Sequence, residues 1–255
     1  MMLKAHLAIG FAVLAISPSA FADRRAYGVT YEAVTAPQGE LDVETWSTFA
    51  PKGEVSGGPS SRGIREMIEI EYGVTDHWDV ALYNMLDVIT SGETKSGYAG
   101  LSLETRYRPS DRGEWPIDPV FYFEFQELFR GDARQKYEAK LILAKDIGNV
   151  NIATNVALEE ERTTDPSWNT EIEYAFATSY AFSPAWVLGA EVFGKAEKGE
   201  TGHLSSRNWA GPALSWAGGG RGALRGSWVT LAGGAGLGGE ADPYYARLII
   251  GLQFR

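Results

Sequence analysis

The sequence contains no cysteine, few histidines and fewer basic than acidic residues. Its 255 residues include three histidines, His6, His77 and His203, and 23 basic against 33 acidic residues, a net charge of −10. The lack of cysteine excludes disulfides and thiolate metal sites. Histidines so few and so far apart predict no metal site, and nothing in the sequence indicates a cofactor. Because neutralising phosphates needs a basic face, we expect no nucleic-acid partner.

Long apolar runs are also missing beyond the first residues. Lys4, the apolar stretch Leu7–Ile16 and the small-residue site Ala20-Phe21-Ala22 predict a cleaved signal peptide over residues 1–22. That apolar stretch is too short to cross about 30 Å of hydrocarbon as a helix. No later stretch is long enough either, so two classes remain: a soluble periplasmic protein or a transmembrane β-barrel, whose strands alternate instead.

Alternation of apolar and polar residues runs through most of the chain. Near residues 64–73, for example, Ile68, Ile70 and Tyr72 oppose Glu69 and Glu71. About twelve such windows occur, near residues 39–49, 64–73, 78–83, 101–108, 121–126, 136–143, 150–159, 171–182, 186–192, 208–216, 224–234 and 244–254. An even number of strands of this length suits a tilted membrane barrel, although a soluble β-sandwich alternates too.

Connection lengths and aromatic positions separate these two folds. Residues 73–77, 146–149 and 183–185 form short turns, whereas 50–63, 87–97, 160–167 and 195–206 form long polar loops. Short and long connections alternate, with exceptions at 109–119 and 129–134, as in barrels with periplasmic turns and external loops. Aromatic residues gather at strand ends, as a bilayer interface selects. The sequence therefore predicts an all-β, transmembrane, up-and-down antiparallel barrel of about twelve strands over residues 39–255. Residues 23–38 form a periplasmic lead-in or the start of the first strand.

The last strand carries a further signal. Its alternating residues end in Phe254 before Arg255, and here the chain resembles Gram-negative outer-membrane barrels, whose aromatic end is recognised by the barrel-assembly machinery. With Gly39-Glu40, the stretch Glu71–Val80 and Gly211-Pro212, the layout is similar to a group of outer-membrane transport barrels that includes the phenol-degradation-associated family. The resemblance implies a position in the cell outer membrane among lipid and lipopolysaccharide, and uptake of small solutes, hydrophobic compounds included. It brings no set of functional residues.

The polar face of the strands points to the lumen and carries more acids than bases. The candidate lumen-lining residues are Glu69, Glu71, Glu104, Arg106, Glu124, Glu138, Lys140 and Glu173. Burying so many charges in a dry core is costly, so the interior is either wet or densely ion-paired. A wet lumen predicts a passive pore that favours cations or small polar solutes. An ion-paired lumen predicts a plugged structural or adhesive barrel. The small residues Ala175, Ala177, Ser179 and Ala181 argue locally against filling, because they leave space.

Catalysis is a remote alternative. His203-Leu204-Ser205 has the His-x-Ser spacing of outer-membrane esterases such as phospholipase A and the lipid A deacylases, and the histidine could activate the hydroxyl as a general base. Ser206 follows where those families have asparagine, and the pair falls in an expected loop. We therefore expect no catalytic residues and no enzyme. The acidic stretch Glu159–Glu161 is expected in an outer loop, either solvated or attracting divalent cations that bridge lipopolysaccharide.

Overall fold

The computed structural model describes residues 24–51, 63–91, 93–130, 133–164, 168–198, 204–218, 226–238 and 241–254. The expected signal peptide lies outside these residues. Within them no helix is long and apolar enough to span a membrane. Twelve strands are present: β1 (Leu41–Ala50), β2 (Gly63–Thr75), β3 (Trp78–Ser91), β4 (Glu93–Tyr107), β5 (Asp118–Leu128), β6 (Ala133–Ile147), β7 (Val150–Thr163), β8 (Trp168–Ala181), β9 (Trp186–Lys198), β10 (Leu204–Ala217), β11 (Ser227–Gly236) and β12 (Tyr244–Phe254).

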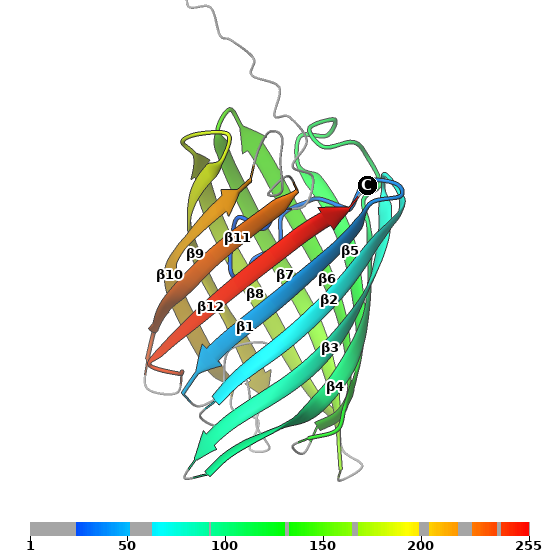
Figure 1. Cartoon of the computed structure of the whole chain (residues 1–255). Coiled ribbons are helices and arrows are strands. Elements are labelled where there is room, and N and C mark those ends of the chain that lie inside the picture. Colours follow the sequence, from blue (N-terminus) through cyan, green and yellow to red (C-terminus); the bar gives the residue numbers. More distant parts are fainter. Residues whose placement is uncertain are drawn as a thin grey trace, which may run out of the picture.

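These strands form one closed barrel in which every strand pairs antiparallel with its neighbours in the sequence (Figure 1). β12 closes the sheet against β1, with Leu41 opposite Phe254 and Phe49 opposite Ala246. Closure leaves no sheet edge, so the strands satisfy one another's backbone hydrogen bonds within hydrocarbon. The predicted all-β, up-and-down barrel of about twelve strands is confirmed.

The period of two in the sequence becomes two faces of the sheet. On β2, Ile68 and Ile70 are 41% and 43% exposed on the outer surface, whereas Glu69 and Glu71 are completely buried inside. Successive side chains of a strand point to opposite faces, so one face of each strand meets lipid and the other meets the lumen. The charged side chains of each strand therefore point toward the barrel axis.

The two ends of the barrel differ. The end with the tight β2–β3 and β6–β7 turns also holds the start of β1 and the end of β12, and we call it the turn end; the opposite end is the loop end. Three of the long loops expected at the loop end are partly strand. β3 continues to Ser91 and β4 begins at Glu93, β7 continues to Thr163, β9 continues to Lys198 and β10 begins at Leu204. The backbones of these residues continue the antiparallel pairing of the hairpins beyond the windows in which apolar and polar residues alternate.

The segment before β1 lies inside the barrel. Residues 24–38 contain no strand, and β1 begins only at Leu41. Their hydrogen bonds reach inward side chains on β1, β2, β3, β7, β9 and other strands, so the chain enters the lumen before it joins the sheet. We call residues 24–38 the lumen plug. Its irregular backbone is tolerated at membrane depth because it is enclosed by protein.

Candidate functional site

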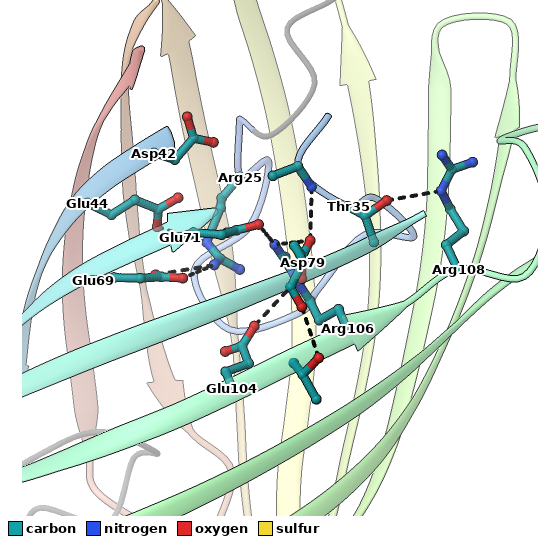
Figure 2. A network of polar contacts seen from close by, with 12 residues as sticks. Arg25, Thr35, Asp42, Glu44, Glu69, Glu71, Asp79, Glu104, Arg106 and Arg108 are labelled. Atoms are coloured by element: carbon teal, nitrogen blue, oxygen red, sulfur yellow. Dashed lines mark hydrogen bonds and ion pairs between the residues drawn. The ribbon is translucent and has the colours of Figure 1, made fainter. Parts of the chain in front are cut away.

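All eight candidate residues lie on the lumen side of their strands, where each is buried or half-buried. Seven of them form two groups, and Glu124 lies between these, opposite Glu104 of β4 and Glu138 of β6 in the strand register. Glu69, Glu71, Glu104 and Arg106 come together on β2 and β4 toward the turn end (Figure 2). Glu138, Lys140 and Glu173 lie on β6 and β8 toward the loop end. Glu124 lies on β5, where its carboxylate accepts hydrogen bonds from Ser102 and Tyr122.

Arg106 is the centre of the turn-end group. Its Nε donates to Asp79 Oδ1 at 3.1 Å and its Nη2 donates to Asp79 Oδ2 at 2.9 Å. The same guanidinium also forms ion pairs with Glu71 and, at 3.4 Å, with Glu104. Two parallel hydrogen bonds between a planar guanidinium and the two oxygens of a carboxylate fix the relative position of both groups. One arginine thus holds together three acidic side chains from β2, β3 and β4.

A second arginine comes from the lumen plug. Arg25 lies 3.1 Å from Glu44 and 3.4 Å from Glu69, and its guanidinium lies 4.6 Å from the ring centroids of both Tyr31 and Trp46. Arg25 and Arg106 thus pair with five buried carboxylates, those of Glu44, Glu69, Glu71, Asp79 and Glu104. A sixth buried carboxylate, Asp42, lies beside them and accepts a hydrogen bond from Gln253 (Figure 2). We call these six carboxylates and two arginines the turn-end cluster. The formal charge of the turn-end cluster is 2 − 6 = −4.

A single carboxylate on the barrel wall holds the middle of the lumen plug. Glu191 on β9 accepts hydrogen bonds from the backbone N–H groups of Gly28, Val29 and Thr30, each at 3.0 Å. The Thr30 and Tyr245 hydroxyls add two more, both at 3.1 Å. Successive backbone N–H groups that converge on one anion form a concave anion-binding site. The Gly28 carbonyl in turn accepts a 2.7 Å hydrogen bond from Arg247.

The neighbouring plug residues make equally specific contacts. The Asn155 side chain accepts from the Tyr31 N–H at 2.7 Å and donates to the Tyr31 carbonyl at 3.0 Å. The Tyr27 hydroxyl lies 2.9 Å from Asn151 Oδ1 and 3.1 Å from Ser179 Oγ. The Asn155 side-chain amide therefore satisfies both backbone groups of Tyr31, as a neighbouring β-strand would. The buried amide group of Asn155 gains its own hydrogen bonds in return.

Small inward residues make room for the plug. Tyr27 packs with Ala26, Ala153 and Ala177 in a buried apolar cluster, and a side-chain carbon at Gly28 would overlap Ala232. The space beside Ala177 and Ser179 was expected to stay open, and that expectation was wrong. The lumen plug occupies this space. The small side chains of the wall leave a volume that the Tyr27 ring and the backbone of Gly28 fill at close packing.

The plug is also held at the turn end. The Ala36 N–H donates to Asp79 at 2.9 Å, and the Thr35 hydroxyl donates to the Asp76 carbonyl at 2.9 Å. Glu32 accepts from the Ala26 N–H at 3.0 Å and lies 3.7 Å from Arg112. Burial raises the pKa of the Glu32 carboxyl, and Arg112 opposes that shift. Every part of the plug thus has defined partners on the wall.

The loop-end group is more evenly paired. Lys140 lies 2.6 Å from Glu138, and Lys136 lies 2.7 Å from Glu159 and 3.1 Å from Glu161. Glu159–Glu161 is therefore part of β7 and not an outer loop, and two of its three carboxylates point into the lumen. Lys195 lies 3.1 Å from Glu171, and Arg207 lies 2.9 Å from Glu197. We call the following the loop-end cluster: Lys136, Glu138, Lys140, Glu159, Glu161, Glu171, Glu173, Lys195, Glu197 and Arg207.

Of the two residues of the remote esterase alternative, His203 and Ser205, the structure describes only Ser205. His203 lies outside the described residues. Ser205 lies on β10, opposite Glu197 of β9 in the strand register. The described part of the chain thus offers no geometry for a histidine-activated hydroxyl at this position.

Similarity to known proteins is confined to structure. No family model matches the sequence, and no curated protein sequence matches it. Among solved structures, the COG4313 outer membrane channel from Pseudomonas putida F1 is similar over 86% of this chain and 97% of its own, with 10% identity and a TM-score of 0.61. The KdgM porin is similar over 84% and 98%, with 10% identity and a TM-score of 0.55. The NanC porin is similar over 84% and 99%, with 9% identity and a TM-score of 0.52.

These similarities place the fold. The chain is a β-barrel with the architecture of outer-membrane channels, as its alternation and its last strand indicated. Identities of 9–10% carry the architecture and no residue roles. The lumen chemistry must be argued from this chain's own side chains.

Proposed function

We propose that this protein is an outer-membrane channel through which small solutes cross passively, along a lumen lined by Glu69, Glu71, Glu104, Arg106, Glu124, Glu138, Lys140 and Glu173. The observation that carries this proposal is the excess of carboxylates over guanidinium groups in the turn-end cluster, a formal charge of −4. A negative lumen with low-dielectric walls concentrates cations and repels anions. The channel therefore favours cations and small polar neutral solutes.

The lumen plug sets the condition for transport. It fills the turn-end half of the lumen, where Glu44, Glu69 and Glu71 are completely buried. Hydrogen bonds and ion pairs hold the plug, and its chain connection to the barrel is through Gly39 and Glu40 to β1. Passage through this half requires the plug to shift while β1 stays in the sheet.

The same plug favours a second candidate function, a structural or adhesive barrel whose lumen stays closed. Its support is the number of buried plug contacts, from Arg25 at Glu44 to Ala36 at Asp79. In either case residues 1–22 direct export, the barrel lies among outer-membrane lipid and lipopolysaccharide, and β12 with Phe254 serves recognition by the barrel-assembly machinery. The outward apolar face and the alternation of β12 support this part of the proposal.

Planar-bilayer recordings of the purified protein distinguish the two candidates. In a KCl gradient the channel should give a cation-selective reversal potential, and Glu69→Gln/Glu71→Gln should reduce that selectivity. The matched control is Glu66→Gln, on the outer face of the same strand, where Glu66 bonds the Ser47 hydroxyl at 2.6 Å. Liposome swelling with solutes of graded size then gives the size limit. Absence of conductance at any voltage would support the closed structural barrel.

A further inference from the structure

Two carboxylates on the barrel wall share one indole N–H. Glu44 and Trp46 lie on β1, and Glu69 lies on β2 directly opposite Glu44 in the strand register. The Trp46 N–H donates to Glu44 at 2.9 Å and to Glu69 at 3.1 Å, and all three side chains are buried. Like charges that face each other across a sheet repel, so these two carboxylates need a cation. We call Glu44, Trp46 and Glu69 the β1–β2 site.

The lumen plug supplies that cation. Arg25 Nε donates to Glu44 at 3.1 Å, and Arg25 Nη2 lies 3.4 Å from each oxygen of Glu69 (Figure 2). The guanidinium carbon lies 4.6 Å from the centroid of the Trp46 ring. A planar guanidinium donates to carboxylates along its edges while its face attracts an aromatic ring, whereas an ammonium is a compact point charge without that plane. The group that the β1–β2 site holds is therefore a guanidinium.

The β1–β2 site belongs to the wall and not to the plug. Glu44, Trp46 and Glu69 lie on strands that pair on both sides in the closed sheet, so they stay in place when the plug moves. Arg25 leaves with the plug. Tyr31, whose ring centroid also lies 4.6 Å from the guanidinium carbon, leaves with it. A displaced plug thus exposes two carboxylates and one indole face to the lumen.

The emptied site remains negative. Arg247 stays near it, because its guanidinium carbon lies 5.5 Å from the Trp46 centroid and it donates to the Thr48 hydroxyl at 2.8 Å. Counting Arg247 against Glu44 and Glu69, the formal charge without Arg25 is 1 − 2 = −1. A cation offsets this charge and an anion adds to it. The emptied site is therefore suited to a cation with the shape of the Arg25 side-chain end.

We propose that the β1–β2 site binds solutes that carry a guanidinium group, and that Arg25 occupies it as an internal competitor. A solute guanidinium takes the place of Arg25 only after the plug has moved, and it then keeps the plug displaced. Such a ligand raises the population of the displaced state by a factor of 1 + [L]/Kd. The inference rests on the proposed channel function, in which passage through the turn-end half requires the plug to shift.

Isothermal titration calorimetry of the Arg25→Ala barrel in detergent measures the site without its competitor. The probe is methylguanidinium chloride, and methylammonium chloride carries the same charge without the plane. Methylguanidinium should bind saturably and methylammonium at least about tenfold more weakly, because only the planar group reaches both carboxylates beside the ring. Arg25→Ala/Glu69→Gln should weaken methylguanidinium binding at least about tenfold, since one of the two carboxylates is lost.

Arg24→Ala is the matched control for this titration. Arg24 precedes Arg25, but its guanidinium lies 3.5 and 3.4 Å from the Pro184 and Ala185 carbonyls and contacts no residue of the β1–β2 site. Its removal leaves Arg25 in place, so Arg24→Ala should bind methylguanidinium at least about tenfold more weakly than Arg25→Ala does. A heat-dependent gel shift establishes that each variant is folded.

Cysteine labelling tests the competition in a chain that keeps Arg25. Ala33 lies in the plug and is 1% exposed, so Ala33→Cys should react with a water-soluble maleimide chiefly when the plug is displaced. At ten times the dissociation constant measured in Arg25→Ala, methylguanidinium should speed this labelling about tenfold. Methylammonium at the same concentration and ionic strength should leave the rate unchanged. If Arg25→Ala does not fold, the difference between the two salts in this assay still decides the question.

Three results would overturn the proposal: no saturable heat with methylguanidinium in Arg25→Ala, equal affinity for methylammonium, or labelling of Ala33→Cys that methylguanidinium does not accelerate. None of these measurements needs conduction, so the channel proposal would still be judged by its own recordings. Conversely, a barrel that binds methylguanidinium and releases its plug but never conducts would retain the β1–β2 site and lose the channel.

Discussion

Removing the Glu191 carboxylate should release the lumen plug. In Glu191→Ala, three buried backbone N–H groups, of Gly28, Val29 and Thr30, lose their acceptor, as do the Thr30 and Tyr245 hydroxyls. Hydrogen bonds to a charged group contribute about 1.5–3 kcal/mol each, and such bonds to one shared carboxylate are not additive. If the lost hydrogen bonds together stabilise the plug by only about 3 kcal/mol, the displaced plug is roughly a hundredfold more populated in Glu191→Ala than in the unaltered chain.

The absence of native cysteine makes this population measurable. A single cysteine at Ala33, which is 1% exposed in the plug, should react slowly with a water-soluble maleimide in the otherwise unaltered chain. In Ala33→Cys/Glu191→Ala the rate should rise about a hundredfold if opening limits labelling. Ala33→Cys/Glu160→Ala is the matched control and should keep the slow rate. Equal rates in both double variants would refute the assignment of Glu191 as the group that holds the plug.

Three further outcomes follow from the same contacts. Arg25→Met should lower barrel stability by about 3–5 kcal/mol, measured as the urea midpoint of the gel shift, because Glu44 and Glu69 lose their buried cation; an unchanged midpoint would contradict the pairing. Gly28→Ala should speed labelling at Ala33→Cys, since the added carbon overlaps Ala232 and lies 2.9 Å from Glu191; slow labelling would show that the plug backbone can move aside. Lys136→Met should raise cation selectivity in bilayer recordings, because Glu159 and Glu161 lose their counter-ion; a shift toward anions would contradict the lumen orientation of β7.

The barrel itself could be predicted from the sequence because each strand repeats the same local rule. On β2 the alternation of Ile68, Glu69, Ile70 and Glu71 fixes both the strand and the direction of each side chain. The inward position of all eight candidate residues follows from the same rule. The loops were less predictable. The stretches 87–97 and 160–167 look like loops in the sequence, yet residues 87–91, 93–97 and 160–163 pair as extensions of β3, β4 and β7.

The lumen plug could not be predicted, because residues 24–38 have no period of two and no helical period. Arg25, Tyr27 and Tyr31 therefore carried no signal in the sequence, and Glu191 read as one more lumen acid. One signal was available. The inward residues of β7 to β11 are largely small, among them Ala153, Ala177, Gly189, Ala213 and Ala232. So many small side chains on one wall leave a volume that close packing requires something else to fill.

The conductance of a chain that lacks residues 23–38, with the signal peptide placed directly before Gly39, tests the central claim most directly. Loss of Arg25 changes the formal charge of the turn-end cluster to 1 − 6 = −5. The account therefore expects a conductance severalfold above that of the full chain, with a reversal potential of stronger cation preference. A conductance equal to that of the full chain, or a preference for anions, would contradict an acid-lined lumen closed by its own amino-terminal segment.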